Sequence, residues 1–362
     1  MQQTNHHKFP YRWTLKDARF TKDKGKVFSC FACGGGSTMG YKLAGFDVIG
    51  CNEIDPRMNK VYVANHHPRL NYLCDIREMV TRELPEELYH LDVLDGSPPC
   101  SSFSTSGNRD KDWGKEKHFR EGQQSQVLDT LFFDFIVLAK KLQPKVVIAE
   151  NVKGLILGAA MDYVRRIHEA FDEAGYYVQH FLLNAATMGV PQQRERVFFI
   201  CLRKDLAEPF LETVGLFDKM PYIDMEFNEP PILFGEVADN LGRPLTPTTI
   251  QYKLWKEVRD GETDLASAAI RIYGKKKFFS TRLFYKDQVA WTLVPDYHCC
   301  LLHKDEPVFL SDSEIVKCSS FPSDYDNQDQ KVGYMCGMSV PPVMMAQVAS
   351  RVYEQWLSKI HE

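Results

Sequence analysis

The sequence predicts an α/β fold, with a mostly parallel sheet and a second, smaller domain. Two observations predict it. Short apolar runs alternate with segments of helical spacing through the first half of the chain, and this alternation is typical of βαβ units. The alternation stops after residue 206, where a Pro-rich and then irregular stretch begins. We therefore expect one domain over residues 1–206, completed by 326–362, and a second domain over 207–325.

The individual elements follow from local pattern. The predicted strands are the apolar runs at 27–32, 46–53, 70–75, 91–96, 145–151 and 197–206. Helices are predicted near 56–66, 125–142 and 159–174, because apolar residues recur there at intervals of three and four. The C-terminal segment 340–360 is predicted as a closing helix. It is so apolar that it needs a partner, and the exposed face of the first domain is the expected one.

Composition limits the class of protein. With 362 residues, of which 44% are hydrophobic and 25% charged, the chain has enough apolar residues for a sizeable core. It has no apolar run of the roughly 18–20 residues that a membrane span needs, and no membrane is expected as a partner. Ten scattered cysteines and an N-terminus without an apolar stretch predict reduced thiols and a cytoplasmic location. A net charge of −4 excludes a wholly basic nucleic-acid coat but allows one basic face.

Three predicted strand ends favour a nucleoside site. The first strand leads into the glycine-rich turn FACGGGSTMG (31–40), where backbone can approach a ligand at a helix N-terminus. Glu53 ends the second strand, where an acid is placed to accept ribose hydroxyls. Asp75 ends the third and could take an adenine amino group. Each feature alone is weak, and because the turn lacks the Lys-Ser/Thr of a P-loop, nucleotide hydrolysis is disfavoured.

Two further strand ends carry reactive side chains. Cys100 follows two prolines in DGSPPCSSFS (95–104) and is a candidate nucleophile. Glu150, in AENV, could hydrogen-bond a ring nitrogen of a substrate if it is protonated. The polar stretch 101–126 between them is predicted as a lid or binding loop. The alternatives are that Cys100 is an inert buried cysteine, that Glu150 caps a helix, and that 101–126 is a passive surface insertion.

Cations gather in two segments. Gln192, Arg194 and Arg196 alternate in GVPQQRERVFF, and a period of two puts them on one strand face, suited to a carbonyl oxygen or the DNA backbone. In the second domain, IRIYGKKKFFSTRLFYK (270–286) is basic without an acid of its own and rich in aromatics. Clustered cations suit phosphates. The alternative for the first segment is an exposed, charged strand edge, and the alternative for 270–286 is a solvated hairpin.

Taken together, the blocks FACGGG, NEID, SPPCSSFS, AENVKG and QQRER resemble, in order and spacing, those of the C5-cytosine-specific DNA methyltransferase family. The resemblance covers residues 27–203, and FP (321–322) and CGMSVPPV (336–343) resemble its last two blocks. It implies a Rossmann-like sheet that binds S-adenosylmethionine and a smaller target-recognition domain. It also implies transfer of a methyl group to C5 of a flipped cytosine in a specific double-stranded DNA sequence.

The resemblance implies roles for particular residues. Cys100 would attack C6, Glu150 would contact N3 and the exocyclic amine, Arg196 would hold O2, and Arg194 would organise the pocket and the loop. The implied cofactor contacts are Phe31, Cys33, Gly34, Gly35, Gly36, Glu53, Ile54, Asp75, Ile76, Pro99, Leu131, Met338, Ser339 and Val340. The expected DNA contacts are Gln192, Ser102, Arg271, Lys275, Lys276, Lys277 and Arg282.

The chain also departs from the family pattern. Ser29 stands where an acid is common, Cys33 replaces a glycine, and Met338 replaces an asparagine. Cys30 and Cys33 form a CxxC, but no second ligand pair has zinc spacing, and no metal is expected. The alternatives are therefore a relative that uses a modified sulfonium donor, a DNA-binding regulator without catalysis, and an RNA cytosine-5 methyltransferase. A monomer on DNA is expected, with a cognate restriction endonuclease as a candidate partner.

Overall fold

The computed structural model describes residues 7–99, 116–117, 126–127, 130–214, 218–274, 281–295 and 301–360. The chain divides into two compact units. The sheet unit comprises Arg19–Asn184, Glu195–Glu226 and Met345–Glu362. The second unit comprises Met1–Ala18, Ala185–Arg194 and Phe227–Met344. The domain boundaries proposed from the sequence, at 206 and 325, stay a prediction.

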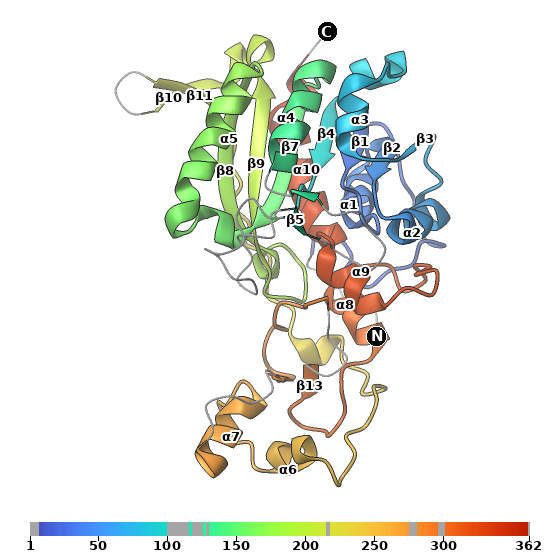
Figure 1. Cartoon of the computed structure of the whole chain (residues 1–362), viewed down its shortest axis with the longest axis vertical. Coiled ribbons are helices and arrows are strands. Elements are labelled where there is room, and N and C mark those ends of the chain that lie inside the picture. Colours follow the sequence, from blue (N-terminus) through green and yellow to red (C-terminus); the bar gives the residue numbers. More distant parts are fainter. Residues whose placement is uncertain are drawn as a thin grey trace. The chain divides into compact units, whose positions relative to one another are not determined.

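A seven-stranded sheet, of order β3-β2-β1-β4-β7-β9-β8, forms the centre of the sheet unit (Figure 1). The strands β1, β2, β3, β4 and β7 run parallel, whereas β9 is antiparallel to both of its neighbours. The order reverses between β1 and β4, which is where doubly wound sheets bind ligands. The strands are β1 (Lys26–Cys30), β2 (Asp47–Glu53), β3 (Leu70–Leu73), β4 (Val93–Gly96), β7 (Val146–Val152), β8 (Tyr176–Asn184) and β9 (Glu195–Arg203).

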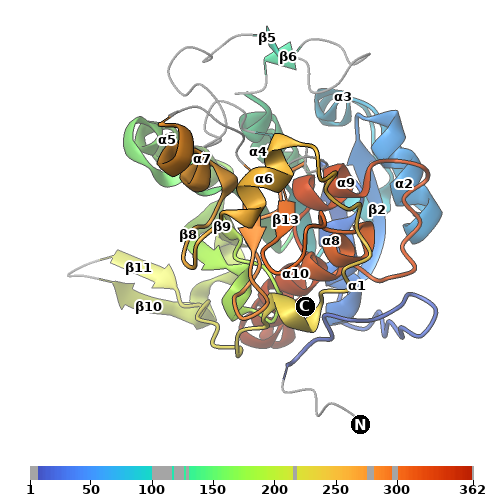
Figure 2. The same ribbon diagram turned by 90° about the horizontal axis from the view of Figure 1, so that it is seen from below.

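Helices cover both faces of this sheet. The views in Figures 1 and 2 place α3, α4 and α5 on one face and α1 and α10 on the other. The helices are α1 (Gly36–Ala44), α2 (Pro56–His66), α3 (Ile76–Thr81), α4 (Leu131–Leu142), α5 (Met161–Glu173) and α10 (Pro342–Gln355). From Met345 on, the predicted closing helix belongs to the sheet unit. The ring of its Tyr353 packs edge-on against Phe46.

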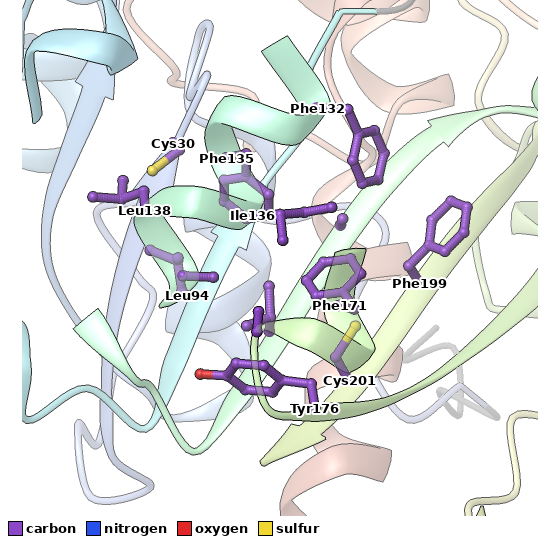
Figure 3. Close-up of a cluster of buried hydrophobic side chains, with 14 of the residues drawn as sticks. Cys30, Leu94, Phe132, Phe135, Ile136, Leu138, Phe171, Tyr176, Phe199 and Cys201 are labelled. Atoms are coloured by element: carbon purple, nitrogen blue, oxygen red, sulfur yellow. The ribbon is translucent and has the colours of Figure 1, made fainter. Parts of the chain in front are cut away.

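The main core lies under α3, α4 and α5. Alternate residues of β1, β4, β7 and β9 point into it, among them Cys30, Leu94 and Phe199, and meet Phe132 and Phe135 of α4 (Figure 3). Gly96 ends β4 where a Cβ atom would come within 2.6 Å of the Phe135 ring. Only glycine therefore allows α4 to lie this close to the strand that leads into the Pro-Pro-Cys motif.

The second unit is built from short elements. Its helices are α6 (Ile250–Lys256), α7 (Leu265–Tyr273), α8 (Asp312–Cys318) and α9 (Val332–Met338), and β12 (Arg282–Phe284) pairs in parallel with β13 (Leu301–His303). A small core formed by Leu254, Leu265 and Leu283 with their neighbours holds α6 and α7 to this ladder.

The α/β fold and each predicted strand are confirmed, with the last strand beginning at Glu195. The sequence reading missed β8, whose burial does not alternate, and the hairpin β10 (Leu211–Val214) and β11 (Asp218–Pro221). Most of the predicted lid at 101–126 lies outside the described residues. Within it, β5 (Glu116–Lys117) pairs with β6 (Gln126–Val127). Across the described ranges, no helix is long and apolar enough to span a membrane.

Candidate active site

The turn after β1 has an unusual backbone. Phe31 and Cys33 have φ of +52° and +46°, and Gly35, the N-cap of α1, has φ of +88°. Residues other than glycine rarely adopt this left-handed backbone conformation, which costs them roughly 1–2 kcal/mol each. Cys33 thus keeps a backbone conformation that favours glycine. The Gly35 N–H donates to the Ala32 carbonyl at 2.9 Å, which closes the turn.

Glu53 is held against this turn. Its Oε2 accepts a hydrogen bond from the Cys33 backbone N–H at 2.6 Å, and its Oε1 accepts from Ile54 and Asp55 at 2.8 Å each. Burial raises the pKa of this carboxyl, and the three backbone donors oppose the rise. The next residue, Ile54, leaves 39% of its surface exposed. An oriented carboxyl, an exposed apolar side chain and a strained turn together fit a nucleoside.

The other predicted cofactor residues of the sheet unit lie near the same strand ends. Asp75 is the N-cap of α3 and accepts from the Arg77 backbone N–H. Ile76 and Leu131 are buried in the main core, and Pro99 is half-buried at the end of the described segment. In the second unit, Met338 is 37% exposed, while Ser339 and Val340 are buried.

A row of buried polar groups crosses the sheet face opposite the main core. In the strand registers Ser29 faces Asp95, Asp95 faces Ile148, and Glu150 faces Phe198. Residues two apart on a strand share a face. Ser29, Asp95, Glu150 and Arg196 therefore lie on one face of four adjacent strands.

Glu150 and Arg196 form the charged end of this row. Glu150 Oε1 lies 2.9 Å from Arg196 Nε, and the two side chains are only 10% and 15% exposed. Burial lowers the pKa of Arg196, which Glu150 counteracts. The adjacent Asn151 donates from Nδ2 to the Pro98 carbonyl at 3.0 Å. This bond ties the ion pair to the segment that leads, two residues later, to Cys100, which itself lies outside the described residues.

Asp95 is a site residue that the sequence reading missed. Its Oδ2 accepts from Ser29 Oγ at 2.7 Å and its Oδ1 from Tyr41 OH at 3.3 Å. Burial raises the pKa of Asp95 to about 7, and the charge of Glu150 adds to the rise. The sequence feature that could have indicated Asp95 is an acid within the apolar run LDVLDG, just as Glu150 is an acid within the apolar run of its own strand.

We expect Asp95 to make folding pH-dependent. Because the native state binds this proton more tightly than the unfolded chain, stability is highest below about pH 4, where both states are protonated, and it falls as pH rises from there until the native carboxyl has ionised at about 7. Urea unfolding between pH 5 and 8 should show the wild type losing about 3 kcal/mol relative to Asp95→Asn. Cys30, Tyr41 and Glu150 are the titratable neighbours and are present in both proteins. Parallel pH profiles would contradict the prediction.

The row predicted at Gln192, Arg194 and Arg196 is divided, because β9 begins only at Glu195 and residues 185–194 belong to the second unit. Gln192 Nε2 donates to the Cys318 carbonyl, and its Oε1 accepts from the Leu293 N–H. Arg194, 2% exposed, binds backbone carbonyls. Neither side chain is at the surface, and the DNA contact expected of Gln192 stays a prediction.

The predicted DNA contacts of the second unit are only partly described. Arg271 on α7 is paired with Glu262 through two hydrogen bonds of 3.1 and 3.2 Å, an acid from outside the basic segment. Arg282 is exposed and lies over the Trp291 ring. Phe284 belongs to the interior. Ser102, Lys275, Lys276 and Lys277 lie outside the described residues.

The CxxC of the turn does not form a reactive pair. Cys30 points into the main core (Figure 3), where burial raises the pKa of its thiol well above the ordinary value. Cys33 lies half-exposed in the turn. Among the residues that the structure describes, no group of three or more His, Cys, Asp or Glu side chains could hold a metal ion.

The sheet order, which reverses between β1 and β4, defines the class as a Rossmann-like α/β protein. Residues 25–354 match the family of C-5 cytosine-specific DNA methylases, and the chain belongs to this family.

Relatives in this family include the type II methyltransferases M.FnuDI of Fusobacterium nucleatum and M.NgoPII of Neisseria gonorrhoeae. M.FnuDI is 39% identical over 50% of this chain and 48% of its own length, and M.NgoPII is 37% identical over 51% and 50%. The chain thus spans about half the length of these relatives. A putative DNA modification methyltransferase encoded within an E. coli prophage shares the fold. Its TM-score is 0.60 and its identity 20%, over 91% of this chain and 99% of that one.

Proposed function

We propose that the chain is an S-adenosylmethionine-dependent DNA (cytosine-5-)-methyltransferase. The observation that carries the proposal is the buried Glu150–Arg196 ion pair, joined through Asn151 to the Pro98 carbonyl. A carboxyl and a guanidinium side by side match the N3, amine and O2 edge of cytosine in hydrogen-bonding capacity. The Pro98 carbonyl, two residues before Cys100, is thereby held beside that pair.

The base is bound by these two side chains. Arg196 donates to O2, and Glu150 contacts N3 and the exocyclic amine, which stabilises the negative charge that develops on the ring. Their ion pair orients both groups before the base arrives, so little reorganisation is left for the reaction. Because C5 and C6 are inaccessible in a stacked duplex, the cytosine is extruded from the duplex to reach these side chains.

Cys100 is the nucleophile. Its thiolate forms a bond to C6, which makes C5 nucleophilic. Once C5 carries the methyl group, a solvent water or hydroxide takes the C5 proton; the electrons of that C–H bond restore the C5–C6 double bond, and the C6–S electron pair leaves with the Cys100 thiolate. A proton taken up from solvent as the base binds is shared between Glu150 and N3, lies on N3 while the ring is negative, and returns to the carboxyl when the thiolate leaves.

The donor is assigned to the turn at residues 31–36, with Glu53 at the ribose, Ile54, Asp75 and Ile76 at the adenine, and Pro99, Leu131 and residues 338–340 around the rest. When bound, S-adenosylmethionine supplies an electrophilic methyl group. The oriented carboxyl of Glu53 and the exposed side chain of Ile54 support this assignment.

Recognition of the DNA sequence is assigned to the second unit, where Arg282, one of the predicted DNA contacts, is exposed. Double-stranded DNA is the proposed substrate, and a restriction endonuclease the proposed partner, because the relatives are named type II methyltransferases. Met338 supports one alternative, a modified sulfonium donor, since this apolar, half-exposed side chain stands where the family has asparagine.

The proposal is tested with the full chain, methylation-free genomic DNA and labelled S-adenosylmethionine. We expect 5-methylcytosine at one short sequence, and a covalent adduct on DNA that contains 5-fluorocytosine. Label in transfer RNA alone would instead favour the RNA enzyme. Modification only with an extended donor would favour the altered relative, and DNA binding without either product would favour the regulator.

A further inference from the structure

Arg194 is a buried cation held by backbone oxygens in the second unit. Its Nη2 donates to the carbonyls of Gly337 and Ser339 at 2.8 and 3.0 Å, and its Nη1 donates to the Leu293 carbonyl at 3.3 Å. The residue is 2% exposed. A guanidinium in this position joins two chain segments that are more than forty residues apart in sequence.

The two segments that Arg194 joins are packed without space between them. A Cβ atom on Gly337 would lie 2.6 Å from the Pro295 nitrogen and 2.8 Å from the Val294 carbonyl carbon. The guanidinium also lies at the C-terminal end of α9, where unpaired carbonyls favour a cation. The position of residues 337–339 is therefore determined by close packing and by Arg194 together.

The segment held in this way presents a hydroxyl with no partner. Ser339 is 4% exposed, and within the described part of the chain its Oγ makes no hydrogen bond. A buried hydroxyl without a partner is costly, at about 1–3 kcal/mol, and such groups in native proteins need an explanation. A bound polar ligand supplies one.

We propose that Arg194 is a positioning residue for the donor and does not touch the base: it holds the Gly337 and Ser339 carbonyls so that residues 338–340, and the Ser339 hydroxyl, meet the bound donor. The inference rests on the proposed function, since it takes these residues as donor contacts. It gives the two arginines of the QQRER motif different roles. Arg196 pairs with Glu150, whereas Arg194 acts through the backbone of residues 337–339.

Gln192 provides a matched control. It is equally buried, lies two residues before Arg194, and also holds backbone groups, at Cys318 and Leu293. Both residues hold the Leu293 segment, but within the described part of the chain the side-chain hydrogen bonds of Gln192 go to Cys318 and Leu293 and not to residues 337–339. Gln192→Met should therefore lower the stability of this unit without a specific effect on the donor.

The test is calorimetric binding of S-adenosylhomocysteine to the full chain without DNA. We expect Arg194→Met to raise the Kd at least tenfold, Arg194→Lys at least threefold, Ser339→Ala severalfold, and Gln192→Met less than twofold. At saturating donor, the rate of methyl transfer by Arg194→Lys should stay within about threefold of wild type, because KM and not kcat carries the loss.

Arg194→Lys keeps the charge and is the variant used if Arg194→Met does not fold. A Kd of Arg194→Lys equal to wild type, or an equal rise in Gln192→Met, would overturn the proposal. A loss in kcat with unchanged donor KM would also overturn it, because it would place Arg194 at the base. If the wild type binds no S-adenosylhomocysteine, the proposed function fails instead.

Discussion

Glu150→Gln is expected to lower the rate of methyl transfer at least 100-fold, since a positioned acid–base group contributes about 10²–10⁴-fold. Glutamine keeps the shape of the side chain but cannot share a proton with N3. The same change leaves the Arg196 guanidinium buried without its counter-charge. Removing one partner of a buried ion pair costs about 3 kcal/mol or more, which urea unfolding measures at pH 7.

Glu195→Gln is the control for this prediction. Glu195 precedes Arg196 on β9 and pairs with Lys153 at 2.8 Å, but these side chains are 43% and 39% exposed. Because water screens such a pair, its loss should change stability by less than about 1 kcal/mol. The methylation rate should stay within about twofold. Equal losses in the two variants would remove the special role of Glu150.

Cys100→Ser is expected to abolish methyl transfer and the covalent adduct on 5-fluorocytosine DNA. A serine hydroxyl is far less ionised than a thiol at neutral pH, so the attack on C6 fails although the side chain is nearly the same size. DNA binding, measured by fluorescence anisotropy on the mapped sequence, should remain within about threefold of wild type.

Cys33→Ser is the control, because it shows whether loss of the adduct follows from replacing Cys100 in particular or from replacing any cysteine. Cys33 is a partly exposed cysteine in the turn after β1, and serine preserves the backbone N–H that bonds to Glu53. This variant should still form the adduct. An adduct that persists in Cys100→Ser, or that disappears only in Cys33→Ser, would assign the nucleophile to a different sulfur.

Local pattern was sufficient for most of the sheet. The strands β1, β2, β4 and β7 are largely apolar runs, since parallel strands covered on both faces bury nearly every side chain. It failed for β8, where half-buried residues such as His180 break the pattern. The motifs indicated Glu53, Glu150 and Arg196 because an acid or a cation at the end of an apolar run is conspicuous.

Partners across the fold could not be predicted from local pattern. Asp95 meets Ser29, which is 66 residues away, because β1 and β4 pair in a particular register. Arg271 stands in a segment without acids, and its partner Glu262 comes from outside that segment. Arg194 and Arg196 look equivalent in sequence, yet one binds backbone carbonyls and the other a carboxylate.

The sequence by itself determined the α/β class, the family and the residues with reactive groups, because periodicity and motif spacing are properties of neighbouring residues. Only the tertiary structure decided which buried polar groups face one another: the row from Ser29 through Asp95 to Glu150 and Arg196, and the hold of Arg194 on residues 337–339. The reason is physical. A buried charge must find a partner wherever the chain brings one, and strand register and close packing set that place.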